Sequence, residues 1–322
     1  MLVAPRLRRQ GLSRQSARLT RRISQPSLPP VPELPEVEVT RCQLEPLLVG
    51  RTIATVHTTR PSRFFVTPPH TLRRRLPGRR AVCLERLGKY LLARLDDGQR
   101  LLLHLGMTGQ IFGAGVSSVR LLSATAGAAL GPAAQQAGFR PDRHTHLWLR
   151  FDDGGRDVFF RDTRKFGKVQ LLAAGEPSER LGRLGPDALG VTAAVLRAGL
   201  SARRSPIKSV LLDQSVLAGV GNIYADEALF LARVRPTRRA ARVTRAECLR
   251  LAAAIRRVLR RSIATGGSSI SDYVQPDGSD GSYQDERRVY GREAEPCPVC
   301  STPIRRQRIG QRSSHFCPSC QR

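Results

Sequence analysis

Four cysteines near the end of the chain form an ordered set. Two residues separate Cys297 from Cys300 and Cys317 from Cys320, and sixteen residues lie between the two pairs. This spacing is typical of a four-cysteine zinc site, in which each pair occupies a tight turn and supplies two thiolates to one ion. It predicts a small zinc finger over residues 286–322 that binds one structural zinc ion.

The charge of the chain indicates a polyanionic partner. The formal net charge is +28 and the pI is about 11.5, and arginines, among them Arg312, lie between the two cysteine pairs. An arginine-bearing zinc finger in so basic a chain favours a clamp on nucleic acid rather than a membrane-surface protein. The other three cysteines, Cys42, Cys83 and Cys248, are scattered, which favours a reducing compartment over a disulfide framework.

Residues 1–31 differ in character from the rest. They contain seven arginines and no Asp or Glu, and no apolar stretch approaches the ~20 residues of a membrane span. They are interpreted either as an organellar transit peptide or as an extension from a start placed too far upstream in GC-rich DNA, in keeping with 50 arginines against four lysines. A disordered basic tail that stays attached is the third reading.

The first two readings both make Pro32 the amino terminus. A terminal proline is a secondary amine that can form an iminium with a sugar aldehyde, whereas an internal proline nitrogen is an unreactive amide. We expect the working protein to begin at Pro32.

The pattern of apolar residues predicts a multidomain α+β protein. A helix from Pro32 to about Gly50 precedes short strand-like segments, which indicates a β-sandwich-like domain over 32–175. Helical spacing from about residue 176 predicts an all-α domain over 176–285, whose last long helix is closed by Gly266-Gly267. Residues 113–139, rich in Ala, Gly and Ser, are expected to form a long surface loop. The expected strands are 52–58, 80–86, 90–95, 100–105, 146–151 and 156–161.

A glycine turn between two helices is predicted around residues 217–227. Asn222 fits the N-cap of the second helix, and Gly219 and Gly221 are expected to leave backbone amides free for a phosphate. An ordinary interhelical turn is the alternative interpretation.

Two further segments, 104–109 and 161–167, have the composition of loops at strand ends. Met107 on one and Phe166 on the other could wedge into a duplex vacated by an everted base. Taken alone, both side chains would more often belong to a core. Lys89 is expected at the start of a strand.

Together these segments resemble the formamidopyrimidine-DNA glycosylase family. The resemblance runs from Pro32 to Arg322, interrupted mainly near 113–139. It rests on PELPEVE, LGKYLL, HLGMTG, RDTRKFGK, DQSVLAGVGNIYADEALF, YGREAEPCPVC and QRSSHFCPSCQR. The resemblance implies that the helical domain is of the helix–two-turns–helix type. It also implies an enzyme that excises oxidised purines such as 8-oxoguanine and formamidopyrimidines and then cuts the strand.

The resemblance also implies catalytic roles. Pro32 would attack C1′ and become a Schiff base, Glu33 would assist opening of the sugar ring, and Glu36 would support it before β- and δ-elimination. Two carboxylates beside an amine suit acid–base work, because proximity separates their pKa values. For both glutamates the alternative is a solvated helix start.

The resemblance assigns the DNA contacts as well. Lys89, which is counted with the catalytic residues, would bind the phosphates beside the lesion together with Asn222 and Arg312. Lys208 would lie near the substrate. Met107, Arg164 and Phe166 would fill the hole, and Arg164 would read the orphaned cytosine. The full DNA-binding set is His104, Met107, Arg164, Phe166, Asn222 and Arg312.

Other readings stay open. A capped Pro32 would leave a non-catalytic zinc-finger DNA-binding protein, and the oxidised-pyrimidine branch of the superfamily is disfavoured by the PELPE start. A zinc-ribbon transcription factor would leave the first 250 residues without a purpose. The long segment 113–139, and the lack of a basic residue over 268–273 in the loop 268–285, depart from the resemblance. We expect a monomer that binds double-stranded DNA with oxidised bases or abasic sites. We expect it in the bacterial cytoplasm with the nucleoid, or in an organelle if 1–31 is a transit peptide.

Overall fold

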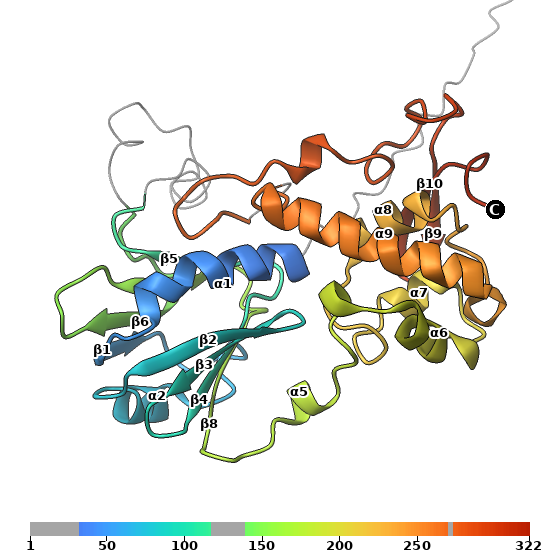
Figure 1. Cartoon of the computed structure of the whole chain (residues 1–322). Helices are drawn as coiled ribbons and strands as arrows, with labels where there is room; N and C mark the ends of the chain where they lie inside the picture. Colours follow the sequence, from blue (N-terminus) through green and yellow to red (C-terminus); the bar gives the residue numbers. More distant parts are fainter. Residues whose placement is uncertain (1–31, 117–138, 270–272) are drawn as a thin grey trace, which may run out of the picture.

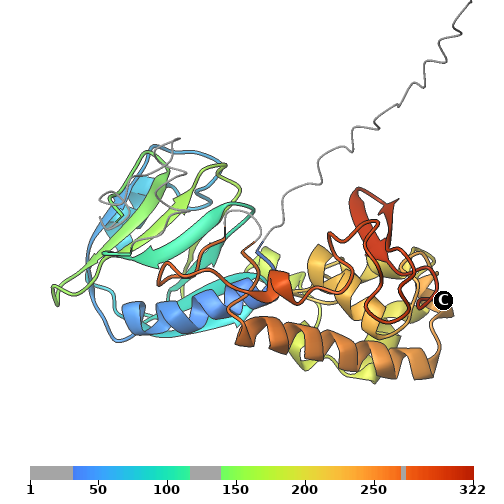
Figure 2. The same cartoon turned by 90° about the horizontal axis from the view of Figure 1, so that it is seen from above.

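The structure, a computed structural model, describes residues 32–116, 139–269 and 273–322 (Figure 1). The expected leader, 1–31, and most of the expected loop 113–139 lie outside the described residues. A β-rich half and a helical half lie side by side, and the C-terminal hairpin packs on the helical half (Figures 1 and 2).

The first half consists of one long helix and two four-stranded antiparallel sheets. The orders are β1-β6-β7-β5 and β2-β3-β4-β8, and side chains from both sheets and from α1 share one apolar core. The elements are α1 (Leu34–Leu48), β1 (Ile53–Thr58), α2 (Pro69–Arg75), β2 (Ala81–Leu87), β3 (Tyr90–Leu95), β4 (Arg100–His104), β5 (Gly109–Gly113), β6 (Thr145–Phe151), β7 (Val158–Asp162) and β8 (Lys168–Leu172). The predicted helix and six strands are confirmed to within two residues at each end.

Three elements of this half were not predicted. Strand β5 is buried at every position, so it lacks the alternation of apolar and polar residues that identifies a half-exposed strand. Strand β8 directly follows the loop 162–167, and only its first residue, Lys168, belongs to the RDTRKFGK segment. Helix α2 is short and ends in three arginines, Arg73 to Arg75, so it has too few apolar residues to show a helical spacing.

The second half is helical, as predicted. Its helices are α5 (Glu179–Gly182), α6 (Ala193–Ser201), α7 (Ile207–Leu211), α8 (Asn222–Leu231) and α9 (Arg245–Ala264), with 3-10 turns η1 (Ala188–Gly190), η2 (Ala240–Arg242) and η3 (Tyr283–Asp285). Thr244 and Glu247 form a capping box that starts α9. Gly266 and Gly267, both with positive φ, end it as expected.

The chain ends in a two-stranded hairpin, β9 (Arg305–Ile309) and β10 (Arg312–Phe316). A small core that includes Phe230 of α8, Val289 and Ile304 joins this hairpin to the helical half. Within the described ranges, no helix combines the length and apolar character needed to cross a membrane.

Helix α1 connects the two halves at its first turn. Leu34 belongs to the core of the helical half, whereas Val37, one turn along, belongs to the core of the β-rich half. The residues immediately before α1 are therefore held at the junction of both halves.

Candidate active site and nucleic-acid interface

Pro32 and Glu33 lie at the junction, and both are buried. Glu33 caps α1, and its backbone N–H donates to Glu36 Oε2 over 2.8 Å. Its own Oε1 accepts from the backbone N–H of Ile223, at the start of α8, over 3.0 Å. Only 2% of Glu33 and of Glu36 is exposed, so the alternative of a solvated helix start is wrong.

The glycine turn receives the start of α1, and one of its two predicted free amides is occupied. Gly219 donates its N–H to Gln214 Oε1 and accepts from Leu34 through its carbonyl, so this amide is not free for a phosphate. A Cβ on Gly221 would lie 2.1 Å from Glu33 Cδ, which explains the need for glycine there. Gly221 is the N-cap of α8 and Asn222 is the first helical residue, so the expected N-cap was wrong by one position.

The Glu33 carboxyl holds a proton near neutrality. Burial raises its pKa to about 7; Lys89 acts against this shift and Glu36 adds to it. Within the described part of the chain, Glu33 Oε2 is buried and has no hydrogen-bond partner. One oxygen of this carboxyl is therefore anchored to α8, and the other has its hydrogen-bonding capacity unused within the described residues.

Glu36 occupies a different environment. It accepts hydrogen bonds from the Tyr224 hydroxyl, from Glu33 N–H and, over 2.9 Å, from the Ser268 N–H. The Tyr224 hydroxyl lies 2.6 Å from Ser262 Oγ of α9. Burial raises the pKa of Glu36 while these donors oppose the shift. Glu36 thus ties α1, α8 and the start of the segment after α9 together.

Lys89 lies in the turn between β2 and β3 and is partly buried. Burial lowers the pKa of Lys89, the nearby Glu33 carboxyl opposes this change, and Arg312 adds to it. The turn packs on the glycine turn, since a Cβ on Gly88 would lie 3.0 Å from Ala218 Cβ. The fold therefore brings a lysine of the β-rich half within electrostatic range of Glu33, and an arginine of the zinc finger within range of that lysine.

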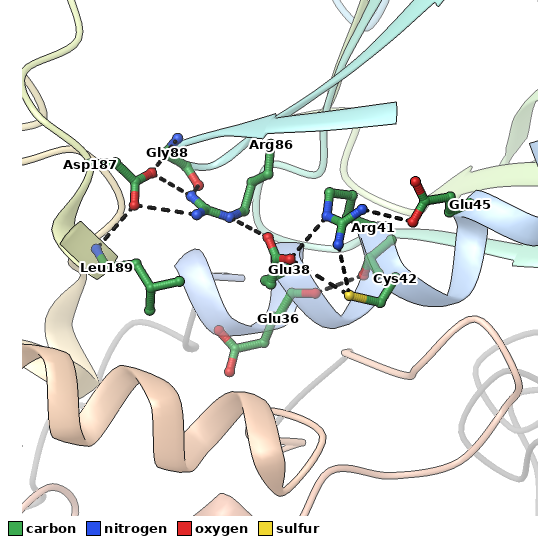
Figure 3. Close-up of polar contacts among 10 residues, drawn as sticks. Glu36, Glu38, Arg41, Cys42, Glu45, Arg86, Gly88, Asp187 and Leu189 are labelled. Carbon is green, nitrogen blue, oxygen red and sulfur yellow. Dashed lines mark hydrogen bonds and ion pairs between the residues drawn. The ribbon is translucent and has the colours of Figure 1, made fainter. Parts of the chain in front are cut away.

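An arginine next to this turn was not identified from the sequence. Arg86 of β2 bonds to Glu38 of α1 over 2.6 Å and to Asp187 of the helical half over 2.5 Å (Figure 3). It also donates to the Gly88 carbonyl, directly before Lys89. The side chain thus holds the Lys89 turn against both halves.

Lys208 forms a fully buried ion pair with Asp226 of α8 (Nζ to Oδ1, 2.7 Å). Burial lowers the pKa of Lys208 and Asp226 opposes this shift. Asp226 also accepts from Ser314 Oγ over 2.9 Å and from His315 N–H over 2.8 Å. The pair therefore seats on α8 the hairpin that carries Arg312.

The two expected wedge segments are turns, β4–β5 and β7–β8. Met107 and Phe166 are both partly exposed, so the core reading does not apply to them. The guanidinium carbons of Arg164 and of Arg63, which was not predicted, lie 4.9 and 4.4 Å from the Phe166 ring centroid. His104 ends β4, and burial, with the positive charge of Lys89, lowers its pKa to about 4.

The four tail cysteines meet at one point. All their sulfurs lie within 4.8 Å of one another, with Cys297 and Cys320 3.9 Å apart and Cys300 and Cys317 3.5 Å apart. Zinc bonded to four sulfurs at about 2.3 Å would place them about 3.8 Å apart. The residues therefore fit one structural zinc ion.

Comparisons with known proteins match all three parts of the chain. The sequence models of the formamidopyrimidine-DNA glycosylase N-terminal domain and H2TH domain match residues 31–169 and 184–274. That of a zinc finger found in FPG and IleRS matches 294–322.

Whole proteins match as well. A formamidopyrimidine-DNA glycosylase of Cereibacter sphaeroides is 43% identical over 304 residues, covering 91% of this chain and all of the relative. The crystal structure of the MutM (Fpg) protein from Thermus thermophilus superposes with a TM-score of 0.75 at 40% identity, covering 90% of this chain and 98% of that one. Lactococcus lactis Fpg in complex with DNA containing an abasic site gives 0.77 at 31% identity, covering 90% and 99%.

Proposed function

This chain belongs to the formamidopyrimidine-DNA glycosylase family, whose members are DNA glycosylases with abasic-site lyase activity, and we propose that its chemistry runs through the Pro32 nitrogen. Its activity is base-excision repair of oxidised purines. The observation that carries the proposal is the Glu33 carboxyl, which is protonated near neutrality and has one free oxygen directly beside Pro32.

The steps follow from these two residues. The Pro32 amine attacks C1′ of the damaged nucleoside, the bond from C1′ to the base breaks, and the base takes up the proton that the nitrogen loses. Glu33 Oε2 gives its proton to the ring oxygen as the C1′–O4′ bond opens, which leaves an iminium on Pro32 and a carboxylate that can accept protons. Loss of a C2′ proton then expels the 3′ phosphate, and a second elimination expels the 5′ phosphate.

This route requires a free amine at Pro32. We therefore propose that residues 1–31 are absent from the active protein, and that the start of α1 becomes the start of the chain. If Pro32 stays an amide, the same fold binds DNA without cutting it.

Polar and charged side chains around the site hold the substrate. Lys89, Asn222 and Arg312 bind the phosphates next to the lesion. What supports this role is that Lys89 interacts electrostatically with both Glu33 and Arg312, and that Asn222 directly precedes Ile223, which bonds to Glu33. His104 contributes a neutral ring at the end of β4. Lys208 contributes indirectly, because its ion pair with Asp226 positions the hairpin that carries Arg312.

On the β-rich half, Met107 and Phe166 occupy the space of the everted nucleotide while Arg164 contacts the orphaned cytosine. The partner is double-stranded DNA with an oxidised base or an abasic site, bound by a single copy of the chain. The zinc ion maintains the finger and takes no part in the reaction. We place the protein in the bacterial cytoplasm with the chromosome, or in an organelle if residues 1–31 direct import.

The test uses a chain that begins at Pro32 and labelled duplexes with one lesion each. A duplex containing 8-oxoguanine opposite cytosine should be cut to products with phosphate at both ends of the gap. Faster cutting of oxidised pyrimidines than of oxidised purines would instead place the chain in the other branch of the superfamily. Glu33→Gln should abolish excision, with Glu45→Gln, at a partly exposed position in the last turn of α1, as the matched control.

A further inference from the structure

We propose that Asp162 is a positioning residue that locks the two wedge turns, 104–109 and 162–167, into one unit and thereby sets the preference for the base opposite the lesion. The inference rests on the proposed function, because it assumes that these turns enter the duplex. Neither the acid–base chemistry nor the phosphate contacts use Asp162, yet it is completely buried at the end of β7.

One carboxylate joins the two turns. Asp162 Oδ1 accepts from the Thr108 hydroxyl over 2.5 Å and from the Arg164 N–H over 3.1 Å. Asp162 Oδ2 accepts from the Gly167 N–H over 2.7 Å. Each oxygen therefore faces a donor, and both turns depend on the same group.

Thr108 and two glycines tighten this link. The Thr108 hydroxyl also accepts from the Arg164 N–H, over 3.2 Å. A Cβ on Gly106 would lie 2.5 Å from the Gly167 nitrogen, so the two backbones are in direct contact. Neither turn can shift without the other.

Asp162 is itself fixed by the sheet. Its backbone N–H donates to the His144 carbonyl over 2.9 Å, and its carbonyl lies 2.9 Å from His146 Nε2. In the proposed function, two residues that contact the duplex each lie close in sequence to one partner of the Asp162–Thr108 hydrogen bond. Met107 directly precedes Thr108, and Arg164 follows Asp162 by two positions. The position of the arginine relative to the methionine is therefore determined by one buried carboxylate.

Asparagine at position 162 should break the link between the two turns. One of its two terminal atoms becomes an NH₂ that faces a donor, and the charge that strengthens the hydrogen bonds is lost. Thr108→Val removes the hydroxyl but keeps the shape, whereas Thr108→Ser keeps the hydroxyl. Asp157→Asn is the control, since Asp157 directly precedes β7 and its side chain bonds to Trp148 of β6.

The assay compares excision of 8-oxoguanine opposite each of the four bases with cutting of a preformed abasic site in single-stranded DNA. Asp162→Asn and Thr108→Val should lower the excision rate opposite cytosine by about ten- to a hundredfold, as expected for the loss of one or two charge-assisted hydrogen bonds. They should also flatten the preference among opposite bases. Cutting of the single strand needs no wedge and should change less than about twofold. Thr108→Ser and Asp157→Asn should behave as the unsubstituted chain.

Hydrogen exchange of the two turns separates this inference from the proposed function. In Asp162→Asn, exchange should accelerate at 104–109 and at 162–167 together, whether or not the chain excises bases. Exchange that accelerates only at 162–167 would overturn the lock. An unchanged opposite-base preference in a variant whose turns both loosen would overturn the role in specificity. If the unsubstituted chain fails to excise, but exchange still accelerates in both turns of Asp162→Asn, the proposed function and the specificity role are refuted. The link between the two turns is then confirmed.

Discussion

Removing the charge of Asp226 should detach the zinc finger from the helical half. In Asp226→Asn the buried Lys208 loses its counter-ion, and the hairpin loses an anionic acceptor for Ser314 and His315. Loss of one partner of a buried pair costs about 3–5 kcal/mol. The cost is limited because Lys208 can lose its proton instead of staying charged. Deprotonating a lysine with an ordinary pKa of 10.5 at pH 7 costs about 4.8 kcal/mol, at about 1.4 kcal/mol per pH unit.

The assay is zinc release in urea, followed with a metal-sensitive dye, because it reports on the finger alone. We expect the free energy of opening to fall by about 3–5 kcal/mol at pH 7. In the variant the pKa of Lys208 is depressed in the folded state, so the unfolded chain binds the extra proton and stability rises with pH. The deficit should therefore be largest near pH 6 and shrink toward pH 10.

Lys208→Met combined with Asp226→Asn is the matched control, because it removes both charges and keeps the side-chain oxygen of the single variant at position 226. It should restore most of the lost free energy. A single variant that costs less than about 1 kcal/mol, or a double variant that is no better than the single one, would refute the reasoning.

Three further outcomes follow from the site. Stripping zinc should unfold 286–322 and abolish DNA binding while Trp148 fluorescence reports an intact first half; loss of both signals would contradict separate folding. DNA affinity should fall steeply with salt, because each phosphate contact releases counterions, and a flat response would contradict the clamp. The excision rate should fall as pH rises through about 7, because Glu33 then loses its proton, and Glu33→Gln should lack this dependence.

Local signals predicted much of the fold. The cysteine spacing located the zinc site, the alternation of apolar residues located six strands, and helical spacing identified the second half. These patterns depend only on residues close in sequence. Strand β5 was not predicted because both of its faces are covered. Predicting that burial requires knowledge of the elements that pack on it.

The candidate site was predicted less completely. The motifs named Glu33 and Lys208, but their partners lie about 190 and 18 residues away along the chain, at Ile223 and Asp226. The purpose of Gly221 was misread, because nothing near it in sequence shows that a carboxylate from α1 needs the space. Asp226 could have been noticed as a carboxylate on the apolar face of a helix, where only a buried cation or donor can satisfy it.

Borohydride trapping tests the role of Pro32 most directly. The chain beginning at Pro32 and the 322-residue chain are each incubated with an abasic duplex and borohydride, and the adduct is located by mass spectrometry of the digested protein. Only the shorter chain should be trapped, and the sugar should be attached to the Pro32 nitrogen. An adduct on Lys89 or another lysine, or equal trapping of both chains, would contradict this role of Pro32.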